Sequence, residues 1–352
     1  MRRSHRTLPR APLLAKSRPA KAKRQVVMPP AGLTLLEGNS VAPRTRSDYE
    51  IRVSDFLAFM VALGLSFSNA QTLVEGLLAY FEQLFWEDRA AAEGDKLVAA
   101  LRFHWPWFAQ DPVPSRVTRA LKGWHRLMPS APRLPLPWAA ICGWAAACVA
   151  LGRADMGLAM LLAADAYLRP GEVMVIRVGS LHQPVAHATG TMGVWCLTIF
   201  DFETGRSSKT GHFNDSIVLD SIGRSGLGLL LSRLAAGRDA AEPLFKFSYL
   251  EWAAVAKRAA AAALLAPLAP VLYQLRHSGP SVDIAEGRRS LAQVKVRGRW
   301  VSDNSVRRYE KHSQLAKQWA MLSPAAQSFA QTSETQIWNV VAGLQVLPLP
   351  RG

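Results

Sequence analysis

Five residues of the chain carry side chains that could act together on a phosphate group. An arginine guanidinium presents a planar fork that can hold two phosphate oxygens. A tyrosine hydroxyl can attack phosphorus when nearby cations or a base favour its phenolate. A lysine can protonate a leaving oxygen, and an indole N–H can donate to a phosphate oxygen. They are Arg169 in AYLRPGEV, Lys209 in SSKTG, Arg276 in LYQLRHSG, Trp300 in RGRW and Tyr309 in SVRRYEKH.

Each of these residues also has an ordinary explanation. Arg169 and Glu172 are spaced to form a structural ion pair, and Lys209 could be a solvated turn lysine. Trp300 could belong to the core, and Tyr309 could be an amphipathic residue on a basic helix. The five residues together, in this order, form a far more specific pattern than any one of them alone.

Common metal and nucleotide motifs are absent from the sequence. It contains no HExxH, CxxC or GxGxxG, and GRSSKTG has Ser208 where a phosphate loop needs glycine. Three cysteines, Cys142, Cys148 and Cys196, are too few for a disulfide framework. Cys142 and Cys148 have no histidine at metal-ligand spacing, so we expect them to be buried packing residues. The sequence therefore predicts no metal ion and no cofactor.

The charge of the chain predicts a polyanionic partner. Among 352 residues, 42 Lys and Arg against 26 Asp and Glu give a net charge of +16, which suits nucleic acid or an acidic membrane. Residues 1–40 are expected to form a basic tail, because the first 24 hold nine Lys or Arg and no acid. This tail could be a disordered solvated segment, or a nuclear-import or DNA-binding segment centred on residues 21–24. A mitochondrial transit peptide fits its Arg and Ser content but not its prolines.

Residues 44–128 are expected to form an all-helical bundle. A first helix follows a cap at Thr45 or Ser47, a second follows Ser68, and two more cover about 93–104 and 113–128. The proline-rich segment 129–137 reads as a stiff linker and marks a domain boundary.

Residues 138–323 are expected to form a second domain, mainly α with a small antiparallel sheet (α+β). The uncharged run 134–152 is interrupted by two prolines, so it predicts a buried core helix rather than a membrane span. Strands are predicted at 194–200 and 216–219, and Gly279–Pro280 is predicted to break a helix. The other helices are expected at 154–167, 224–236, 248–265, 288–296, 302–310 and 313–321.

In this order the motifs resemble the boxes of the tyrosine recombinase (phage integrase) family, over about residues 44–322. LRPGEV is similar to the first arginine box, KTG to the lysine box and LRH to the second arginine box. GRW is similar to the His/Trp position and RYEKH to the nucleophile box. HSGPS, RGRW and RYEKH resemble most the members carried by eukaryotic retroelements.

The resemblance implies an enzyme that breaks and rejoins DNA through a 3′-phosphotyrosine, for site-specific recombination or integration of a mobile element. The bundle would be the core-binding domain, and the partner would be double-stranded DNA, bound by a DNA-induced homo-oligomer (a tetrameric synapse), with no membrane. The location would be the nucleus in a eukaryote, or otherwise the cytoplasm or nucleoid. The implied catalytic residues are Arg169, Lys209, Tyr273, Arg276, Trp300 and Tyr309, supported by Glu172 and His277.

The chain departs from the family at the second arginine box. Tyr273 stands where the family usually has histidine, and a phenol is a poor base near neutral pH. His277 follows Arg276 and is expected to point elsewhere. A catalytically inactive DNA-binding protein on the same fold is therefore the alternative. A basic structural or membrane-surface protein would explain the charge but not the ordered boxes.

The segment 324–352 is expected to begin with a helix over about 324–342. Its apolar residues Phe329, Ile337, Trp338 and Val341 need a surface to cover them. The helix could pack on its own catalytic domain, or it could dock on a neighbouring protomer.

Overall fold

The computed structural model describes residues 33–65, 70–105, 108, 114–130, 134–187, 189–200 and 214–351. The described residues fall into two compact units, with the boundary at Pro132–Arg133, inside the proline-rich segment. We call the first unit the bundle and the second the C-terminal unit, and each is described by itself.

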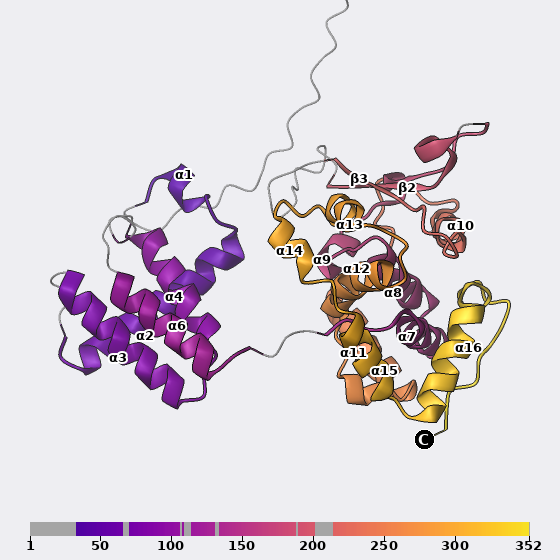
Figure 1. Cartoon of the computed structure of the whole chain (residues 1–352). Helices are drawn as coiled ribbons and strands as arrows, with labels where there is room; N and C mark the ends of the chain where they lie inside the picture. The colour runs from indigo at the N-terminus through magenta and orange to yellow at the C-terminus, as the bar shows by residue number, and fades with distance from the viewer. Residues whose placement is uncertain are drawn as a thin grey trace, which may run out of the picture. The chain divides into compact units, whose positions relative to one another are not determined.

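The bundle is entirely helical in its described part (Figure 1). Helix α2 packs against α3 and α4, and α6 packs against the same two helices. Phe56, Leu77, Leu101 and Trp124 are among the side chains buried between them. The helices are α1 (Leu35–Gly38), α2 (Pro43–Ala62), α3 (Ala70–Trp86), α4 (Ala91–His104) and α6 (Pro114–Leu127).

The start of the bundle differs from the sequence prediction in two ways. Helix α2 begins at Pro43, so Thr45 and Ser47 lie inside its first turns and do not cap it. Proline suits a first helical position, where its missing N–H has no partner to lose. The expected tail is also shorter, because Thr34 and Glu37 form a capping box that starts α1. Residues 1–32 of that tail lie outside the described residues.

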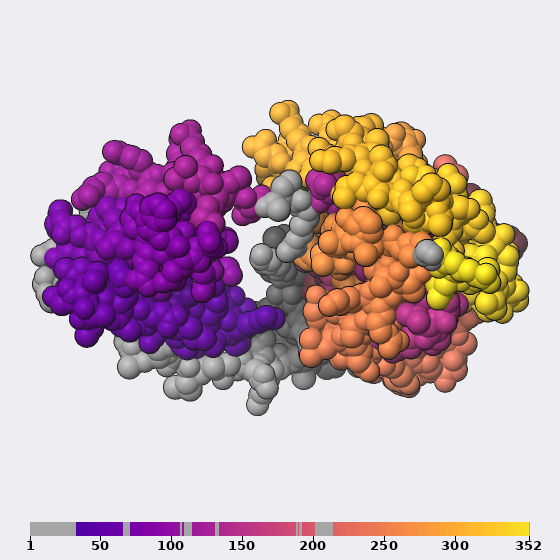
Figure 2. Space-filling view, turned by 90° about the horizontal axis from the view of Figure 1, so that it is seen from below, coloured from indigo at the N-terminus to yellow at the C-terminus, as the bar shows by residue number. Residues whose placement is uncertain are grey.

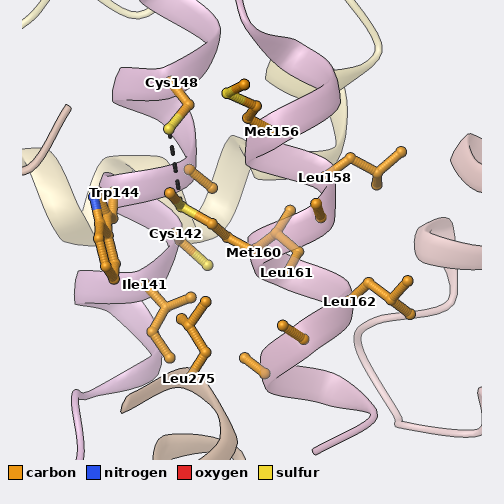
Figure 3. Packing of buried hydrophobic residues seen from close by; sticks show 14 of the residues in the cluster. Ile141, Cys142, Trp144, Cys148, Met156, Leu158, Met160, Leu161, Leu162 and Leu275 are labelled. Atoms are coloured by element: carbon orange, nitrogen blue, oxygen red, sulfur yellow. Dashed lines mark hydrogen bonds between the residues drawn. The ribbon is translucent and has the colours of Figure 1, made fainter. Parts of the chain in front are cut away.

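The core of the C-terminal unit is built on α7 (Trp138–Ala150) and α8 (Ala154–Asp165), shown in Figure 3. Small residues let these helices approach closely, and a Cβ on Gly157 would lie 2.7 Å from the carbonyl oxygen of Ala145. The predictions of a buried core helix and of buried cysteines are confirmed. Cys142 and Cys148 are buried free thiols, and Cys148 Sγ lies 3.8 Å from Met160 Sδ. Burial raises the pKa of the Cys148 thiol to about 12, so it stays protonated.

A three-stranded antiparallel sheet lies beside this helical core, in the order β1–β2–β3. Leu197, Ile199 and Ile217 bury their side chains in the core. The fold class predicted from the sequence, mainly α with a small antiparallel sheet, is confirmed, although β1 is too short to be signalled by the sequence. The strands are β1 (Leu181–His182), β2 (Cys196–Ile199) and β3 (Asp215–Val218).

The remaining elements surround α7, α8 and the sheet. The longer helices follow the order predicted from the sequence. The short helix α9 and the helix α12 were not predicted. The helices are α9 (Pro170–Val173), α10 (Gly226–Ala235), α11 (Tyr249–Ala262), α12 (Leu275–Ala285), α13 (Leu291–Gly298), α14 (Asp303–Arg307), α15 (His312–Ala320) and α16 (Pro324–Val341), with 3-10 turns η1 (Val178–Ser180), η2 (Gly190–Gly193), η4 (Ala266–Leu268) and η5 (Leu272–Gln274).

The prediction that Gly279–Pro280 breaks a helix is wrong. Helix α12 runs through both residues, although an internal proline removes one backbone hydrogen bond. Burial explains why the helix persists, because α12 is packed against α8 and α15 and Gly279 and Pro280 are both buried. Glycine is needed here, since a Cβ at position 279 would lie 1.9 Å from the carbonyl oxygen of Ala164.

Helix α16 packs along α7 of its own unit. Ala330 lies opposite Gly143, and Trp338 covers Gly226 while its Nε1 donates to the carbonyl of Gly223 at 3.2 Å. In Figure 2 the yellow C-terminal residues lie directly on this unit. Of the two expectations for this helix, the structure shows packing on its own domain. Docking on a neighbouring protomer stays a prediction. None of the helices in the described ranges is long and apolar enough to cross a membrane.

We expect Gly279→Ala to destabilise the C-terminal unit by more than about 3 kcal/mol. Overpacking usually costs ~1–3 kcal/mol, but here the added methyl meets a backbone carbonyl that cannot rotate away. Urea unfolding followed by circular dichroism measures the change. Gly171→Ala is the matched control, because its Cβ would enter open space and alanine gains ~0.5–1 kcal/mol over glycine in a helix. Equal stability of the two variants would contradict the packing described here.

Candidate active site

Arg169 lies directly before the short helix α9, at the exit of α8. Tyr167 turns the chain there with a φ of 52°, in the left-handed region that side chains rarely adopt. Arg169 Nη1 donates to Oε1 of Glu172 at 2.6 Å, and the Arg169 backbone N–H donates to Oε2 at 2.8 Å. The ion pair expected from the sequence is therefore present. The Arg169 side chain nevertheless remains 30% exposed, so it can still meet a ligand.

Arg276 lies in the first turn of α12, and its side chain bonds both to Glu172 in α9 and to Gly298 at the end of α13. Its Nη1 donates to the carbonyl of Tyr167 at 2.5 Å and approaches Oε2 of Glu172 at 3.3 Å. Its Nη2 donates to the carbonyl of Gly298 at 3.0 Å. Burial lowers the pKa of Arg276 to about 10, with Glu172 opposing, so the guanidinium stays charged at neutral pH. The two arginines of the sequence prediction thus share one carboxylate.

A third guanidinium, that of Arg299, contacts the same carboxylate. Its Nη2 donates to Oε2 of Glu172 at 2.7 Å, and its Nε lies 3.7 Å from Asp215 Oδ2. Three guanidinium groups therefore lie beside two carboxylates, those of Glu172 and Asp215, which leaves an excess of positive charge. The sequence analysis missed Arg299. Its place directly before Trp300 is a signal, but Arg297 in the same RGRW motif makes that signal ambiguous.

Tyr309 and Trp300 lie against each other beside this charge. Tyr309 follows α14, is only 3% exposed, and has its ring centroid 4.7 Å from that of Trp300. The guanidinium carbon of Arg276 lies 5.1 Å from the Trp300 ring. The structure therefore brings Arg169, Arg276, Trp300 and Tyr309 together from four separate segments.

Burial decides the protonation of Tyr309. It raises the pKa of the Tyr309 phenol, and the nearby charges of Arg276 and Arg308 only partly oppose it. The phenolate is thus disfavoured despite the basic surroundings. Attack by Tyr309 needs either a proton acceptor or a change of its surroundings.

Tyr273 and His277 lie next to the tyrosine. Tyr273 forms a side-chain hydrogen bond with Arg169, and its ring centroid lies 5.3 Å from that of His277. The His277 ring in turn lies 5.6 Å from the Tyr309 ring. The expectation that His277 points away is therefore wrong. Residues 273 and 277 are four apart, so they share one face of the helical turn that Tyr309 covers.

Lys209 falls in 201–213, outside the described residues. In the sequence it stands between β2 and β3, which pair in antiparallel fashion. Its role is therefore argued from the motif alone.

A buried network of ion pairs and hydrogen bonds lies next to the site and holds Tyr167 in place. Asp165 accepts from Arg224 at 3.1 Å and from Arg297 at 2.9 Å. The Tyr167 hydroxyl donates to Asp283 at 2.5 Å, and the Tyr167 ring stacks on Trp300 with 6.2 Å between centroids. The network fixes Tyr167, whose backbone carbonyl accepts a hydrogen bond from Arg276. The sequence analysis did not identify this network, because its members lie far apart in the chain.

The bundle carries a separate basic surface on α6. Arg116, Arg119, Lys122 and Arg126 are exposed, and α6 contains no acidic residue. Their spacing places them on one side of the helix, opposite the buried Val117 and Trp124. We call these four residues the basic face of α6. Such a face suits the phosphate backbone of nucleic acid.

No group of His, Cys, Asp or Glu within the described ranges could hold a metal ion. No protein-family model matches the chain, and no curated protein matches its sequence. Among solved structures, the crystal structure of XerA recombinase aligns with 81% of this chain and 94% of its own, at 14% identity and a TM-score of 0.35. A likeness this weak carries no argument.

The buried network predicts a loss of stability in acid. Burial alone would raise the pKa of Asp165, but Arg297 and Arg224 hold it below its usual range. A lowered folded-state pKa contributes stability above the unfolded value of ~3.9, which is lost as the pH falls through the folded value. We therefore expect Asp165→Asn to cost ~3–5 kcal/mol at pH 7, as when one partner of a buried pair is removed.

The difference between wild type and Asp165→Asn should shrink as the pH falls below about 4. Urea unfolding across this pH range measures it. Asp239→Asn is the control, since Asp239 is exposed and its amide replacement can still accept the hydrogen bond from Ala241. A difference that stays constant with pH would show that the charge of Asp165 does not stabilise the fold.

Proposed function

We propose that this chain breaks and rejoins DNA with Tyr309 as the nucleophile. The observation that carries the proposal is the convergence of Arg169, Arg276 and Trp300 on Tyr309, around an excess of positive charge. A DNA phosphodiester is the anion that a tyrosine in this setting can attack without a metal ion.

The proposed reaction uses the described groups as follows. The Tyr309 oxygen attacks the scissile phosphorus, the bond to the 5′ oxygen breaks, and a 3′-phosphotyrosine forms. Arg169 and Arg276 donate to the non-bridging oxygens and stabilise the charge that develops in the transition state. Attack by a 5′ hydroxyl then reverses the step and rejoins a strand. The phosphotyrosine keeps the energy of the broken bond, so no nucleotide cofactor is needed.

Two protons must move in this reaction. The proton of Tyr309 passes to His277, whose imidazole centroid lies 5.6 Å from that of the Tyr309 ring. Lys209 protonates the departing 5′ oxygen, as the KTG motif suggests. His277 thus performs the part that the histidine replaced by Tyr273 performs elsewhere in the family.

The partner proposed is double-stranded DNA. The basic face of α6 supplies phosphate contacts from the bundle, and the net charge of +16 favours association with a polyanion. Exchange of strands between two sites requires more than one active site, so we propose assembly of several chains on DNA. The compartment is then the one that holds the DNA, the nucleus or the nucleoid.

One observation favours a second function, a DNA-binding protein without catalysis. Tyr273 occupies the position of the usual histidine and bonds Arg169, while burial disfavours the Tyr309 phenolate. Formation of a covalent adduct distinguishes the two functions.

We expect Tyr309→Phe to bind DNA with wild-type affinity and to form no covalent adduct, because only the hydroxyl is lost. Duplexes selected for binding from a random-sequence pool and then nicked would trap the adduct, which survives SDS electrophoresis. Binding is measured by gel shift. An adduct formed by the variant at the wild-type rate would show that another residue attacks. Wild-type binding without adduct supports the second function, and no binding at all supports a basic structural or membrane-surface protein.

We expect Lys209→Ala to cleave ordinary DNA slowly and a 5′-bridging phosphorothiolate at close to the wild-type rate. Removal of one general acid typically costs ~10²–10⁴ in rate, and a sulfur leaving group does not need the proton. Adduct formation on matched duplexes measures both rates, and Tyr309→Phe should remain inactive on either substrate. Equal defects of Lys209→Ala on both substrates would assign the lysine to binding instead.

A further inference from the structure

Arg299 occupies a backbone position that normally belongs to glycine. It ends α13 with φ 56° and ψ 40°, in the left-handed region, directly before Trp300. Helices commonly end in this conformation with glycine, because a Cβ is strained there. Arginine is strained in this position, which directs attention to what its side chain contacts.

The guanidinium of Arg299 is only partly satisfied. Its Nη2 bonds Glu172, and its Nε lies at the long distance of 3.7 Å from Asp215. Its Nη1 is buried and has no hydrogen-bond partner among the described residues. A buried donor without an acceptor is unfavourable, so this N–H is available to a ligand oxygen.

Glu172 cannot neutralise the three cations around it. Its Oε2 already receives donors from the Arg169 backbone, Arg276 and Arg299, and its Oε1 receives Arg169 Nη1. Burial lowers the pKa of Arg299, and the like charges of Arg169 and Arg297 act in the same direction while Glu172 opposes them. A bound oxyanion would relieve this repulsion.

The side chain can also be reached from solvent. It is 16% exposed, and it lines a surface pocket of about 540 Å³ with Lys295, Trp300, Asp303 and Arg307. The pocket lies between α13 and α14, the two helices that flank Trp300.

We propose that Arg299 is a third phosphate-binding arginine of this site, whose Nη1 donates to one non-bridging oxygen of the scissile phosphate. This inference rests on the proposed function and extends it to a residue of the GRW motif that the sequence analysis gave no role. The rival explanation is structural, in which Arg299 only holds Glu172 in place.

Chiral methylphosphonate substrates separate the two explanations. In each diastereomer a methyl group replaces one non-bridging oxygen and removes its charge. On an ordinary phosphodiester, we expect Arg299→Gln to lower the rate of adduct formation by about 10²–10³. On the diastereomer that lacks the oxygen bound by Arg299, the variant should match the wild type within about tenfold. A defect of equal size on all three substrates would overturn the proposal.

Arg258→Gln is the charge-matched control, because Arg258 is exposed on α11 and lies outside both the Glu172 cluster and this pocket. Any defect it causes should be the same on all three substrates. Arg299→Lys guards against misfolding of the glutamine variant, since it keeps the charge but loses the fork. It should show the same dependence on the diastereomer with a smaller defect.

Binding of inorganic phosphate to the DNA-free protein tests the inference separately from cleavage. By calorimetry we expect Arg299→Gln to bind phosphate at least about tenfold more weakly than wild type, as for loss of a hydrogen bond to a charged group. Arg258→Gln should bind it as wild type does. If Arg299→Gln binds phosphate more weakly but the wild type forms no adduct with DNA, the proposed function is refuted and the phosphate site stands. Unchanged binding in Arg299→Gln would refute the phosphate site.

Discussion

Three guanidinium groups meet on the single buried carboxylate of Glu172, and this interaction holds the site together. Arg169 comes from the start of α9, Arg276 from α12 and Arg299 from the end of α13, so segments far apart in the sequence share one anion. The carboxylate of Glu172 compensates part of the positive charge, which stabilises the cluster. The compensation is incomplete, so the cluster keeps a net positive charge. In the proposed reaction, the positive charge is already gathered before the anion binds, so like charges need not be brought together at the moment of reaction.

The helices around the core keep this arrangement rigid. Helices α7 and α8 have small residues where they touch, and α12 approaches α8 so closely that only glycine fits at position 279. The close approach places the Tyr167 carbonyl within reach of Arg276. Asp165 and Asp283 anchor the same region through buried ion pairs. Helix packing and buried ion pairs therefore both fix the position of Tyr167 relative to Arg276.

The sequence predicted the fold class and most helices, because apolar spacing and prolines are local signals. Of the five residues that the sequence analysis recognised by their order, the structure brings Arg169, Arg276, Trp300 and Tyr309 together, while Lys209 lies outside the described residues. The sequence did not predict Arg299 or the role of Tyr167, because both depend on left-handed backbone conformations that tertiary packing imposes. His277 was placed wrongly for a different reason. It was expected to point elsewhere because it follows Arg276, whereas η5 runs directly into α12, so the rings of Tyr273 and His277, four residues apart, are neighbours.

The burial of Tyr309 has a consequence for the lifetime of any ester formed on it. Its ring is enclosed by Trp300 and His277 and is almost inaccessible to water. If the ring keeps these neighbours after attack, water has little access to the phosphorus–oxygen bond from the protein side. Hydrolysis would then be slow compared with attack by a strand end held in place. Such enclosure would make a cut in DNA a temporary state rather than a lesion.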